Sequence, residues 1–282
     1  MGITGISGMA TPATLNARHW VGTHDILLLV LDSLRLDVAQ QALASGRTPF
    51  LHGILPGSVW QPRQTHGSYT FPAHQAFFMG YFPVPVPRPA DYQRVFACAF
   101  SGSTTTGAQT WVTPAATIIQ GLQAVGYHTL CIGGVGFFNP ANALGRVLPG
   151  YFMESHWSDS MGVTGADSTR VQVALACERL QALPRTQRVV LFINVSALHQ
   201  PNCLFTHGAT TDSVATQTEA LAYVDRQLPA LWAALRARGA GFGIICSDHG
   251  TAYGEDGCWG HGFAHPVVWN VPYAEITWES AS

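Results

Sequence analysis

The run Asp25–Leu31, which reads Asp-Ile-Leu-Leu-Leu-Val-Leu, is the strongest strand signal in a chain of 282 residues. An uninterrupted apolar run of this length is typical of a strand that is covered on both faces, as in a parallel sheet. Polar residues follow at once in Asp-Ser-Leu-Arg-Leu-Asp at 32–37, where Ser33 is predicted to cap a helix that runs to about Ser45. The stretch therefore predicts a buried strand whose carboxyl end carries an acid, Asp32.

Strand and helix patterns alternate along the rest of the chain. Helices are expected over 113–124, 171–183 and 213–238, the last interrupted near Pro229, and strands over 127–132, 189–195, 243–246 and 271–277. Such alternation favours an α/β fold with a mainly parallel sheet between two layers of helices. We treat residues 1–282 as one domain, with 1–23 as an N-terminal tail or embellishment and 81–112 as an irregular excursion that forms one wall of a pocket.

The composition narrows the class of protein. Only 11% of the residues are charged, the net charge is -2, and all 14 basic residues are arginines. This charge balance gives no electrostatic case for nucleic acid or an anionic membrane surface as a partner. It also leaves a surface that is poor in charge, which favours self-association into a homo-oligomer.

The cysteines and the N-terminus favour a cytoplasmic location. Six cysteines are scattered without the C-x-x-C spacing of a zinc knuckle, so buried reduced thiols are expected. Residues 1–20 lack a basic region followed by an apolar core, and no run of about 18 apolar residues predicts a membrane span. We therefore expect a soluble cytoplasmic protein without a membrane partner.

A second apolar run, Gly243–Cys246, ends in Ser-Asp-His-Gly, and a further histidine, His261, lies on the loop that follows. Ligands bind at the ends of strands in open α/β sheets, and acids and imidazoles are suitable ligands for a divalent metal. Asp248 and His249 can share one ligand only where the backbone leaves strand geometry, which Gly250 permits. On these residues alone, a polar turn after a core strand is the favoured interpretation.

A third stretch places a hydroxyl group at the start of a helix. Gly-Ser-Tyr-Thr-Phe-Pro-Ala-His at 67–74 leads into an apolar segment that ends at Gly80. Pro72 suits the first turn of a helix, and Gly80 suits its end. Thr70 therefore lies just ahead of a helix N-terminus, where free N–H groups and the helix dipole favour an anion. A helix cap is the alternative role for Thr70.

Taken in order, these stretches resemble the alkaline phosphatase superfamily, especially its sulfatase-like branch, which includes phosphoethanolamine transferases and lipoteichoic acid synthases. The resemblance runs from Asp25 to about Tyr273 and implies a three-layer α/β/α sandwich. Each motif is weak alone, but six of them in order make a specific signal. They are Asp-Ser-Leu-Arg-Leu-Asp at 32–37, Thr-Phe-Pro-Ala-His at 70–74, Gly-Tyr-His-Thr at 126–129, Leu-His-Gln-Pro at 198–201, Tyr-Val-Asp at 223–225, and Ser-Asp-His-Gly at 247–250 through His261 to Val-Pro at 271–272.

The resemblance implies a metal centre with a nucleophile beside it. Carried over position by position, it makes Asp32, Asp248 and His249 ligands of one divalent metal. Thr70 would be the nucleophile, with its hydroxyl also touching that metal, because a cation lowers the pKa of a threonine hydroxyl. The implied enzyme is a metal-dependent hydrolase or phosphotransferase. It acts on a small-molecule phosphate monoester, phosphodiester or phosphonate through a phosphothreonine at Thr70.

His199 and His261 match histidines that bind a second metal or the oxyanion of the substrate in the phosphoethanolamine transferases. One or two divalent ions are therefore expected, with zinc first and manganese, magnesium or calcium as alternatives. Phosphodiesterases of the superfamily usually carry an aspartate four residues before the first of these histidines. This chain has Val195 there, with Asn194 and Ser196 beside it. A second metal would thus have only two obvious protein ligands.

Departures from the sulfatases weigh against sulfate-ester hydrolysis. A sulfatase would have Cys or Ser in place of Thr70, with Arg two residues after the proline, where this chain has His74. The lysines that hold sulfate in those enzymes cannot occur in a lysine-free chain. A sulfuric ester hydrolase without formylglycine and a non-catalytic metal-binding protein are the alternatives. His74 itself is either a structural hydrogen-bonding group or a substrate contact.

Four further side chains receive structural interpretations. Asp37 is expected to pair with Arg35, and Asp225 is expected to fasten its own helix. Glu255 and His265 lie near the motif loops and are interpreted as solvated loop residues. None of the four is predicted to act on the substrate.

Overall fold

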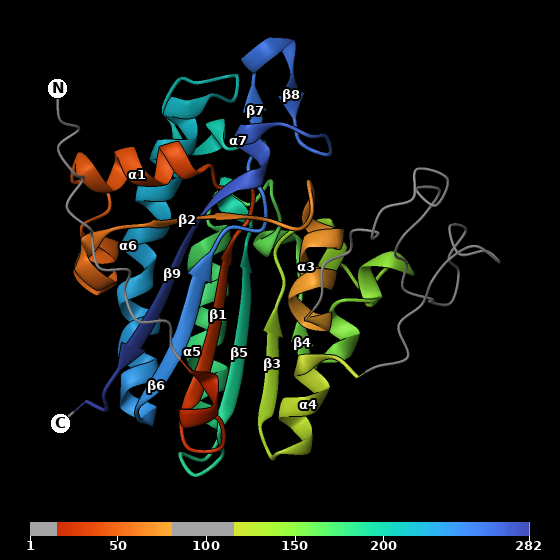
Figure 1. Cartoon of the computed structure of the whole chain (residues 1–282), viewed down its shortest axis with the longest axis vertical. Helices are drawn as coiled ribbons and strands as arrows, with labels where there is room; N and C mark the ends of the chain where they lie inside the picture. The colour runs from red at the N-terminus through yellow and green to blue at the C-terminus, as the bar shows by residue number, and fades with distance from the viewer. Residues whose placement is uncertain (1–15, 81–115, 282) are drawn as a thin grey trace, which may run out of the picture.

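The computed structural model describes residues 16–80 and 116–281. Its main sheet has seven strands, and near one edge the sheet includes antiparallel pairs. The strands are β1 Asp25–Leu31, β2 Gln61–Gln64, β3 His128–Ile132, β4 Glu154–His156, β5 Val189–Val195, β6 Gly241–Cys246 and β9 Asn270–Trp278. They lie in the order β2-β9-β6-β1-β5-β3-β4, and helices cover both faces (Figure 1).

The sheet is mainly parallel. β1 pairs in parallel with β5 on one side and with β6 on the other, and β3 pairs in parallel with β5 and β4. Only β9 runs antiparallel to its neighbours, β2 and β6. The α/β fold with a mainly parallel central sheet, expected from the alternation of strand and helix patterns, is confirmed.

The run that predicted a central strand is β1, which is buried on both faces. Leu27, Leu29 and Leu31 point into one hydrophobic core, whereas Ile26 and Val30 point into a second core on the opposite face. Successive side chains of a strand alternate between faces, so an unbroken apolar run is what this position requires. β1 pairs in parallel with β5 and β6, so the polar residues that follow these three strands lie at the same edge of the sheet.

Helices from different parts of the chain form the two outer layers. The first core packs under α1 Leu36–Ala44, α2 Pro49–Ile54, α5 Ser168–Ala182 and α6 Val214–Arg238. The second core packs under α3 Thr70–Met79 and α4 Ile118–Ala124, as Figure 1 shows. A short helix, α7 Pro266–Trp269, precedes β9. Within the described residues, no helix is long and apolar enough to cross a membrane.

Two helix predictions were wrong in detail. Ser33 does not cap α1: its φ is 64°, its hydroxyl bonds to Asp32, and the helix begins only at Leu36. α6 is not interrupted at Pro229, because the helix continues through it to Arg238. Buried leucines on both sides of the proline pack against the first core, and such tertiary packing outweighs the local cost of proline.

Several boundaries also differ from expectation. The helix expected over 113–124 begins at Ile118, where Thr117 and Gln120 form a capping box, and residues 113–115 lie outside the described part. The predictions for 1–15 and 81–112 lie outside it too. The strands β2 and β4 were missed because both are short edge strands with exposed polar residues.

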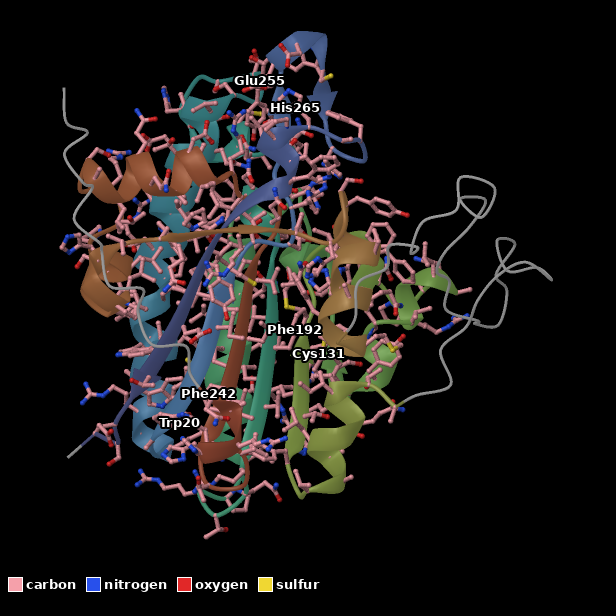
Figure 2. All side chains as sticks on the ribbon, viewed as in Figure 1. Trp20, Cys131, Phe192, Phe242, Glu255 and His265 are labelled. Atoms are coloured by element: carbon pink, nitrogen blue, oxygen red, sulfur yellow. The ribbon has the colours of Figure 1, made fainter. Side chains whose placement is uncertain are left out.

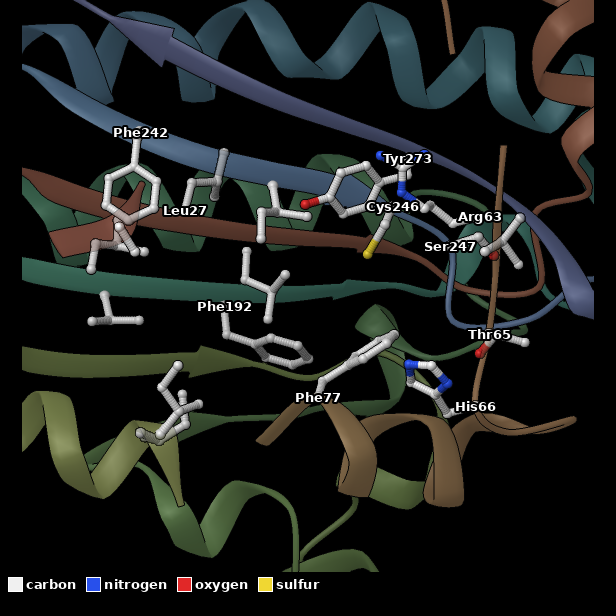
Figure 3. A pocket seen from close by; sticks show the side chains of 18 of the residues that line it. Leu27, Arg63, Thr65, His66, Phe77, Phe192, Phe242, Cys246, Ser247 and Tyr273 are labelled. Carbon is white, nitrogen blue, oxygen red and sulfur yellow. The ribbon is translucent and has the colours of Figure 1, made fainter. Parts of the chain in front are cut away.

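Within the described part of the chain, a cavity of about 460 Å³ lies on the second face of the sheet. It is bordered by Phe192, Phe242, Cys246 and Tyr273 from the strands and by Phe77 from α3. Figure 3 shows these side chains along the strands, with Phe242 at one end and Thr65, His66 and Ser247 at the other. The groove thus runs along the sheet toward the edge where the polar residues gather.

Candidate active site

Acidic and imidazole side chains meet at the carboxyl ends of two neighbouring strands. Asp32 follows β1 directly, and Asp248 and His249 follow β6 after Ser247. Because β1 and β6 pair in parallel, both strands end at the same edge of the sheet. One ligand atom from each of these three residues lies within 4.8 Å of the others, and all three side chains are fully buried. The structure therefore brings together the residues predicted to hold the first metal.

The turn after β6 lets Asp248 and His249 face the same point. Thr65, the residue after β2, fixes this turn because its hydroxyl group donates a hydrogen bond to the carbonyl oxygen of Asp248. A Cβ on Gly250 would lie 1.9 Å from the carbonyl oxygen of Val267, so only glycine fits at this position. Gly250 thus permits the turn by allowing a close approach of two backbone segments.

Two carboxyl groups side by side in this interior oppose each other's ionisation. Burial raises the pKa of Asp248 well above its usual range, and the neighbouring charge of Asp32 raises it further. Burial also acts to raise the pKa of Asp32, but His199, His249 and the hydrogen bond from Asn194 outweigh it and lower this pKa. Asp248 Oδ2 is buried without a hydrogen-bond partner. Such an oxygen is costly unless a cation compensates it.

The ring of His249 presents a lone pair to the same point. Its Nδ1 lies 2.9 Å from the carbonyl oxygen of Gly250, which can only accept, so the proton belongs on Nδ1. Nε2 is then free of a proton, and it lies 3.5 Å from Asp248 Oδ2 and 3.9 Å from Asp32 Oδ1. Burial lowers the pKa of His249 and keeps the ring neutral. Neutral imidazole is the form that binds metals.

This set of donors fits a divalent cation. Two carboxylates and one imidazole nitrogen are ligands that zinc and manganese both accept. A dication between them would neutralise the paired acids and give Asp248 Oδ2 the partner that it lacks. No other three His, Cys, Asp or Glu side chains in the described ranges, 16–80 and 116–281, are grouped closely enough to hold a metal in the same way.

Thr70 lies beside this cluster at the first residue of α3. Its Oγ1 is 3.3 Å from Asp32 Oδ2 and 3.4 Å from His249 Nε2. The alternative role of a helix cap does not apply, because Tyr69 occupies the cap position and makes no side-chain cap bond. No side chain caps the N–H groups of Thr70 and Phe71 in the first turn of this ten-residue helix, so these two groups can donate to an anion next to Thr70.

The chain folds tightly over the start of α3. A Cβ on Gly67 would lie 2.4 Å from the backbone nitrogen of Ala73, so glycine is required where the chain crosses the first turn. The carbonyl oxygen of Ser68 accepts a hydrogen bond from the N–H of Gly262 at 2.7 Å. This bond connects the approach to Thr70 with the loop that carries His261.

His74 is fully buried one turn into α3. Its Nδ1 lies 2.8 Å from the carbonyl oxygen of Thr70 and 3.6 Å from Asp248 Oδ2. The rings of Phe138 and Phe192 pack against it, with centroids 5.4 and 5.6 Å away. Burial lowers the pKa of His74 to about 4 and keeps it neutral. A ring without exposed surface suits the structural interpretation of His74 better than the predicted substrate contact.

His199 and His261 form a pair next to the cluster. Their ring centroids are 5.2 Å apart, and the His261 ring lies 4.5 Å from that of His249. Nδ1 of His199 is 2.6 Å from the carbonyl oxygen of Gln200, so its lone pair is on Nε2. Burial lowers the pKa of His261 to about 4, and the two neighbouring imidazoles act in the same direction. All six residues predicted for the metal site and the nucleophile thus lie in one site.

Asn194 is a further member of the site that the motifs did not single out. Its Nδ2 donates to Asp32 Oδ2 at 2.9 Å, and its Oδ1 accepts from the N–H of Val135 at 3.0 Å. Val195, the position compared with an aspartate in the sequence, packs into the first core instead. The available signal was a polar residue one place before the end of an otherwise apolar strand.

Arg35 and Glu255 also belong to the surroundings of the site. Arg35 pairs with Asp37 at 2.7 Å, as expected, but it also forms an ion pair with Glu255. Glu255 lies between β7 Ala252–Tyr253 and β8 Trp259–Gly260, a small ribbon that leads directly to His261. The solvated interpretation of Glu255 was therefore wrong. Figure 2 shows Glu255 and His265 together in this outer part of the molecule, where His265 caps α7.

Solved structures with a similar fold include domains of phosphoethanolamine transferases. The C-terminal periplasmic domain of phosphoethanolamine transferase EptC from Campylobacter jejuni matches with 12% identity and a TM-score of 0.61, over 90% of this chain and 80% of that chain. The periplasmic domain of EptC from Escherichia coli, in complex with zinc, matches with 13% identity and a TM-score of 0.60, over 91% and 73%. A protein in the alkaline phosphatase superfamily from Vibrio parahaemolyticus matches with 16% identity and a TM-score of 0.56, over 90% and 60%.

The chain shares the fold of these structures, so the resemblance inferred from the six ordered motifs is confirmed at the level of the fold. The chain matches no protein-family model and no curated protein sequence. Asp32, Thr70 and Asp248 meet at the carboxyl edge of the sheet, the edge at which open α/β sheets generally bind ligands.

The comparison contradicts the cytoplasmic location expected from the sequence. Both EptC structures are described as periplasmic domains, which points to an extracytoplasmic location. The expectation rested on the scattered cysteines, on an N-terminus without a signal pattern and on the lack of an apolar run long enough to span a membrane. Cys131 and Cys246 are free and buried among the apolar side chains of the second core, so their reduced state reflects packing and does not report the compartment. Figure 2 shows Cys131 in the interior beside Phe192.

Proposed function

We propose that this protein is a metal-dependent phosphoryl ester hydrolase or phosphotransferase with Thr70 as its nucleophile. The observation that carries the proposal is the position of Thr70 Oγ1, 3.3 Å from Asp32 Oδ2 and 3.4 Å from His249 Nε2. A hydroxyl beside cation ligands and at a helix N-terminus has both an activating group and an anion site next to it. The substrate class is a small-molecule phosphate monoester, phosphodiester or phosphonate.

Asp32, Asp248 and His249 would hold the ion. When bound, a divalent ion at these residues lowers the pKa of the adjacent threonine hydroxyl and so raises the fraction of its nucleophilic form. Zinc is the first choice because it accepts mixed carboxylate and imidazole ligands, and the similar EptC domain from Escherichia coli was solved with zinc. Manganese, magnesium and calcium are the alternatives that reconstitution separates.

The residues of the chain position the reacting groups. Thr70 Oγ attacks phosphorus, so the threonine oxygen–phosphorus bond forms while the bond to the leaving oxygen breaks. The first-turn N–H groups of α3 donate to the phosphoryl oxygens, and His74 fixes this turn through the carbonyl of Thr70. Water or an acceptor hydroxyl then takes the phosphoryl group from Thr70. Hydrolysis and transfer therefore differ only in the acceptor.

The decisive experiment uses protein reconstituted separately with each of the four ions. We expect cleavage of para-nitrophenyl phosphate or its bis-ester, and a loss of at least about 100-fold in Thr70→Ala. Thr70→Ser should retain measurable activity because it keeps the hydroxyl. Acid quenching during turnover, followed by mass spectrometry, should find phosphate on Thr70 in the native chain.

A matched control removes another threonine hydroxyl without touching the site. Thr218 lies on α6, where its Oγ1 donates to the carbonyl of Val214, so Thr218→Ala should keep full activity. Activity of Thr70→Ala at the level of the native chain would show that Thr70 is not the nucleophile. Cleavage of an aryl sulfate alone would favour the sulfuric ester hydrolase. Stoichiometric metal without turnover of any ester would favour a metal-binding protein.

A further inference from the structure

The side-chain amide of Asn194 is locked in one orientation. Its Oδ1 accepts from the N–H of Val135, which can only donate, so the other atom of the amide must be the nitrogen. This nitrogen donates to Asp32 Oδ2 at 2.9 Å. The backbone around it is equally constrained, because Gln172 Nε2 donates to the Asn194 carbonyl at 2.7 Å and a Cβ on Gly134 would lie 2.3 Å from that oxygen.

This orientation has a direct consequence for the ligands of the site. The atom that Asn194 turns toward Asp32 is a hydrogen-bond donor and cannot bind a cation. Asp32 Oδ2 in turn already accepts from Asn194 and lies next to Thr70 Oγ1. Asn194 thus presents an N–H group to Asp32 and offers no lone pair to a cation beside that carboxylate.

The two remaining candidate ligands, His199 and His261, are both imidazoles. Nδ1 of His199 faces the carbonyl oxygen of Gln200, and the ring of His261 packs against that of His199 with centroids 5.2 Å apart. A dication held by two neutral imidazoles would have no anionic ligand of its own, whereas the first position offers two buried carboxylates. The chain therefore does not fit a second permanently bound ion.

We propose that Asn194 limits this centre to one resident divalent ion. The inference rests on the proposed function for the presence of that ion, but the number of ions does not depend on the reaction. Asn194 is in this sense a residue that determines metal stoichiometry. It touches no substrate and acts through Asp32.

The test counts zinc directly. The full chain is equilibrated with zinc buffered by a chelator, which strips weak surface sites, and is then subjected to elemental analysis. We expect one zinc ion per chain. His199→Ala should keep this single ion, because His199 is not one of its ligands. Two tightly bound ions in the native chain, or loss of one ion in His199→Ala, would overturn the proposal.

The matched variant is Asn194→Asp, which has nearly the same shape. One carboxylate oxygen can still accept from Val135, and the other replaces the donor with an acceptor beside Asp32. We expect two zinc ions per chain in this variant, and a larger zinc-dependent rise in its melting temperature than in the native chain. One ion in a folded Asn194→Asp variant would overturn the proposal.

Asn142→Asp is the control for added charge. Asn142 is exposed, and its Oδ1 accepts from Gly145, a bond that aspartate preserves, so the count should stay at one. The result is separable from the proposed function. A chain that binds no zinc would refute the metal dependence, and a chain that binds one ion but cleaves no ester would leave the stoichiometry intact and refute the activity.

Discussion

Glu154 and Asp248 are carboxyl groups in opposite electrostatic situations. Arg179 Nε donates to Glu154 at 2.6 Å, and Nε2 of His156 and of His128 lie 2.6 and 2.9 Å from its oxygens. Burial acts to raise the pKa of Glu154, but these three partners outweigh it and lower the pKa to about 2. Asp248 has another acid as its neighbour, one oxygen without a partner, and a pKa well above its usual range.

The contrast separates a structural acid from a ligand-binding acid. Glu154 receives all its compensation from the chain, and it fastens the edge strand β4 to β3 through His128 and to α5 through Arg179. Asp248 lacks a cationic side chain of its own, so the folded state carries an uncompensated cost that a bound cation removes. An acid with cationic partners, such as Glu154, stabilises the fold. A buried acid without such partners, such as Asp248, indicates a cation-binding site.

The largest effect is expected for Asp248→Asn, which removes the uncompensated charge. We expect phosphoryl ester cleavage to fall by at least about 100-fold, because the ion loses a ligand. The raised pKa of Asp248 means that its ionised form destabilises the metal-free fold at neutral pH. The melting temperature in a chelator should therefore rise by about 2–4 °C, and its response to zinc should disappear. Scanning fluorimetry with and without zinc measures both.

Asp256→Asn provides the comparison at an exposed acid. The Asp256 side chain is 87% exposed and its partner is His265, so neither melting temperature nor zinc response should change. Suppose that zinc raised the melting temperature of Asp248→Asn as much as that of the native chain. Asp248 would then be a structural acid like Glu154, and it would not be a ligand of the first metal.

Much of the fold follows from local pattern because burial and periodicity coincide in it. Val189–Val195 is apolar except for Asn194 and is buried throughout, and Asp25–Leu31 is apolar after Asp25 and buried except for half-buried Leu28. Prediction failed where packing overrode a local rule, as at Pro229, or where a residue adopted an unusual backbone, as at Ser33. Edge strands such as β2 contain few apolar residues, so no hydrophobic pattern in the sequence predicts them.

The site was predictable to the extent that its residues follow strands in a known order. The motifs found Asp32, Asp248 and His249 because strand ends meet at one edge of a parallel sheet. They did not show which way Asn194 points, since that depends on a backbone N–H from a different segment. Nor did they pair Arg35 with Glu255, which lie 220 residues apart in the sequence.

A smaller effect, on stability alone, is expected from Glu154. Its pKa in the folded chain, about 2, is below the usual value of 4.5, so its contribution is complete above pH 4.5 and is lost as the pH falls toward 2. Glu154→Gln should lower the free energy of unfolding by about 1–2 kcal/mol at pH 7 and flatten the pH dependence in that window. Urea unfolding between pH 2 and 7 measures this.

The neighbouring exposed Glu178 is the control for Glu154. Glu178→Gln should leave the unfolding free energy within about 0.5 kcal/mol of the native value across the same pH range. Activity at neutral pH should be unchanged in both variants. A loss of zinc binding in Glu154→Gln would contradict its assignment as a purely structural acid.

The smallest effect is expected for Glu255→Gln, because Arg35 keeps its pair with Asp37 and the glutamine can still accept one hydrogen bond. The ribbon of β7 and β8 loses one anchor, so His261 should be positioned less well, and kcat/KM should fall about threefold with the zinc count unchanged. Glu219→Gln, which breaks the more exposed pair with Arg47, should change neither quantity. A fall in melting temperature without a change in kcat/KM would place Glu255 with Glu154, among the acids that hold the fold.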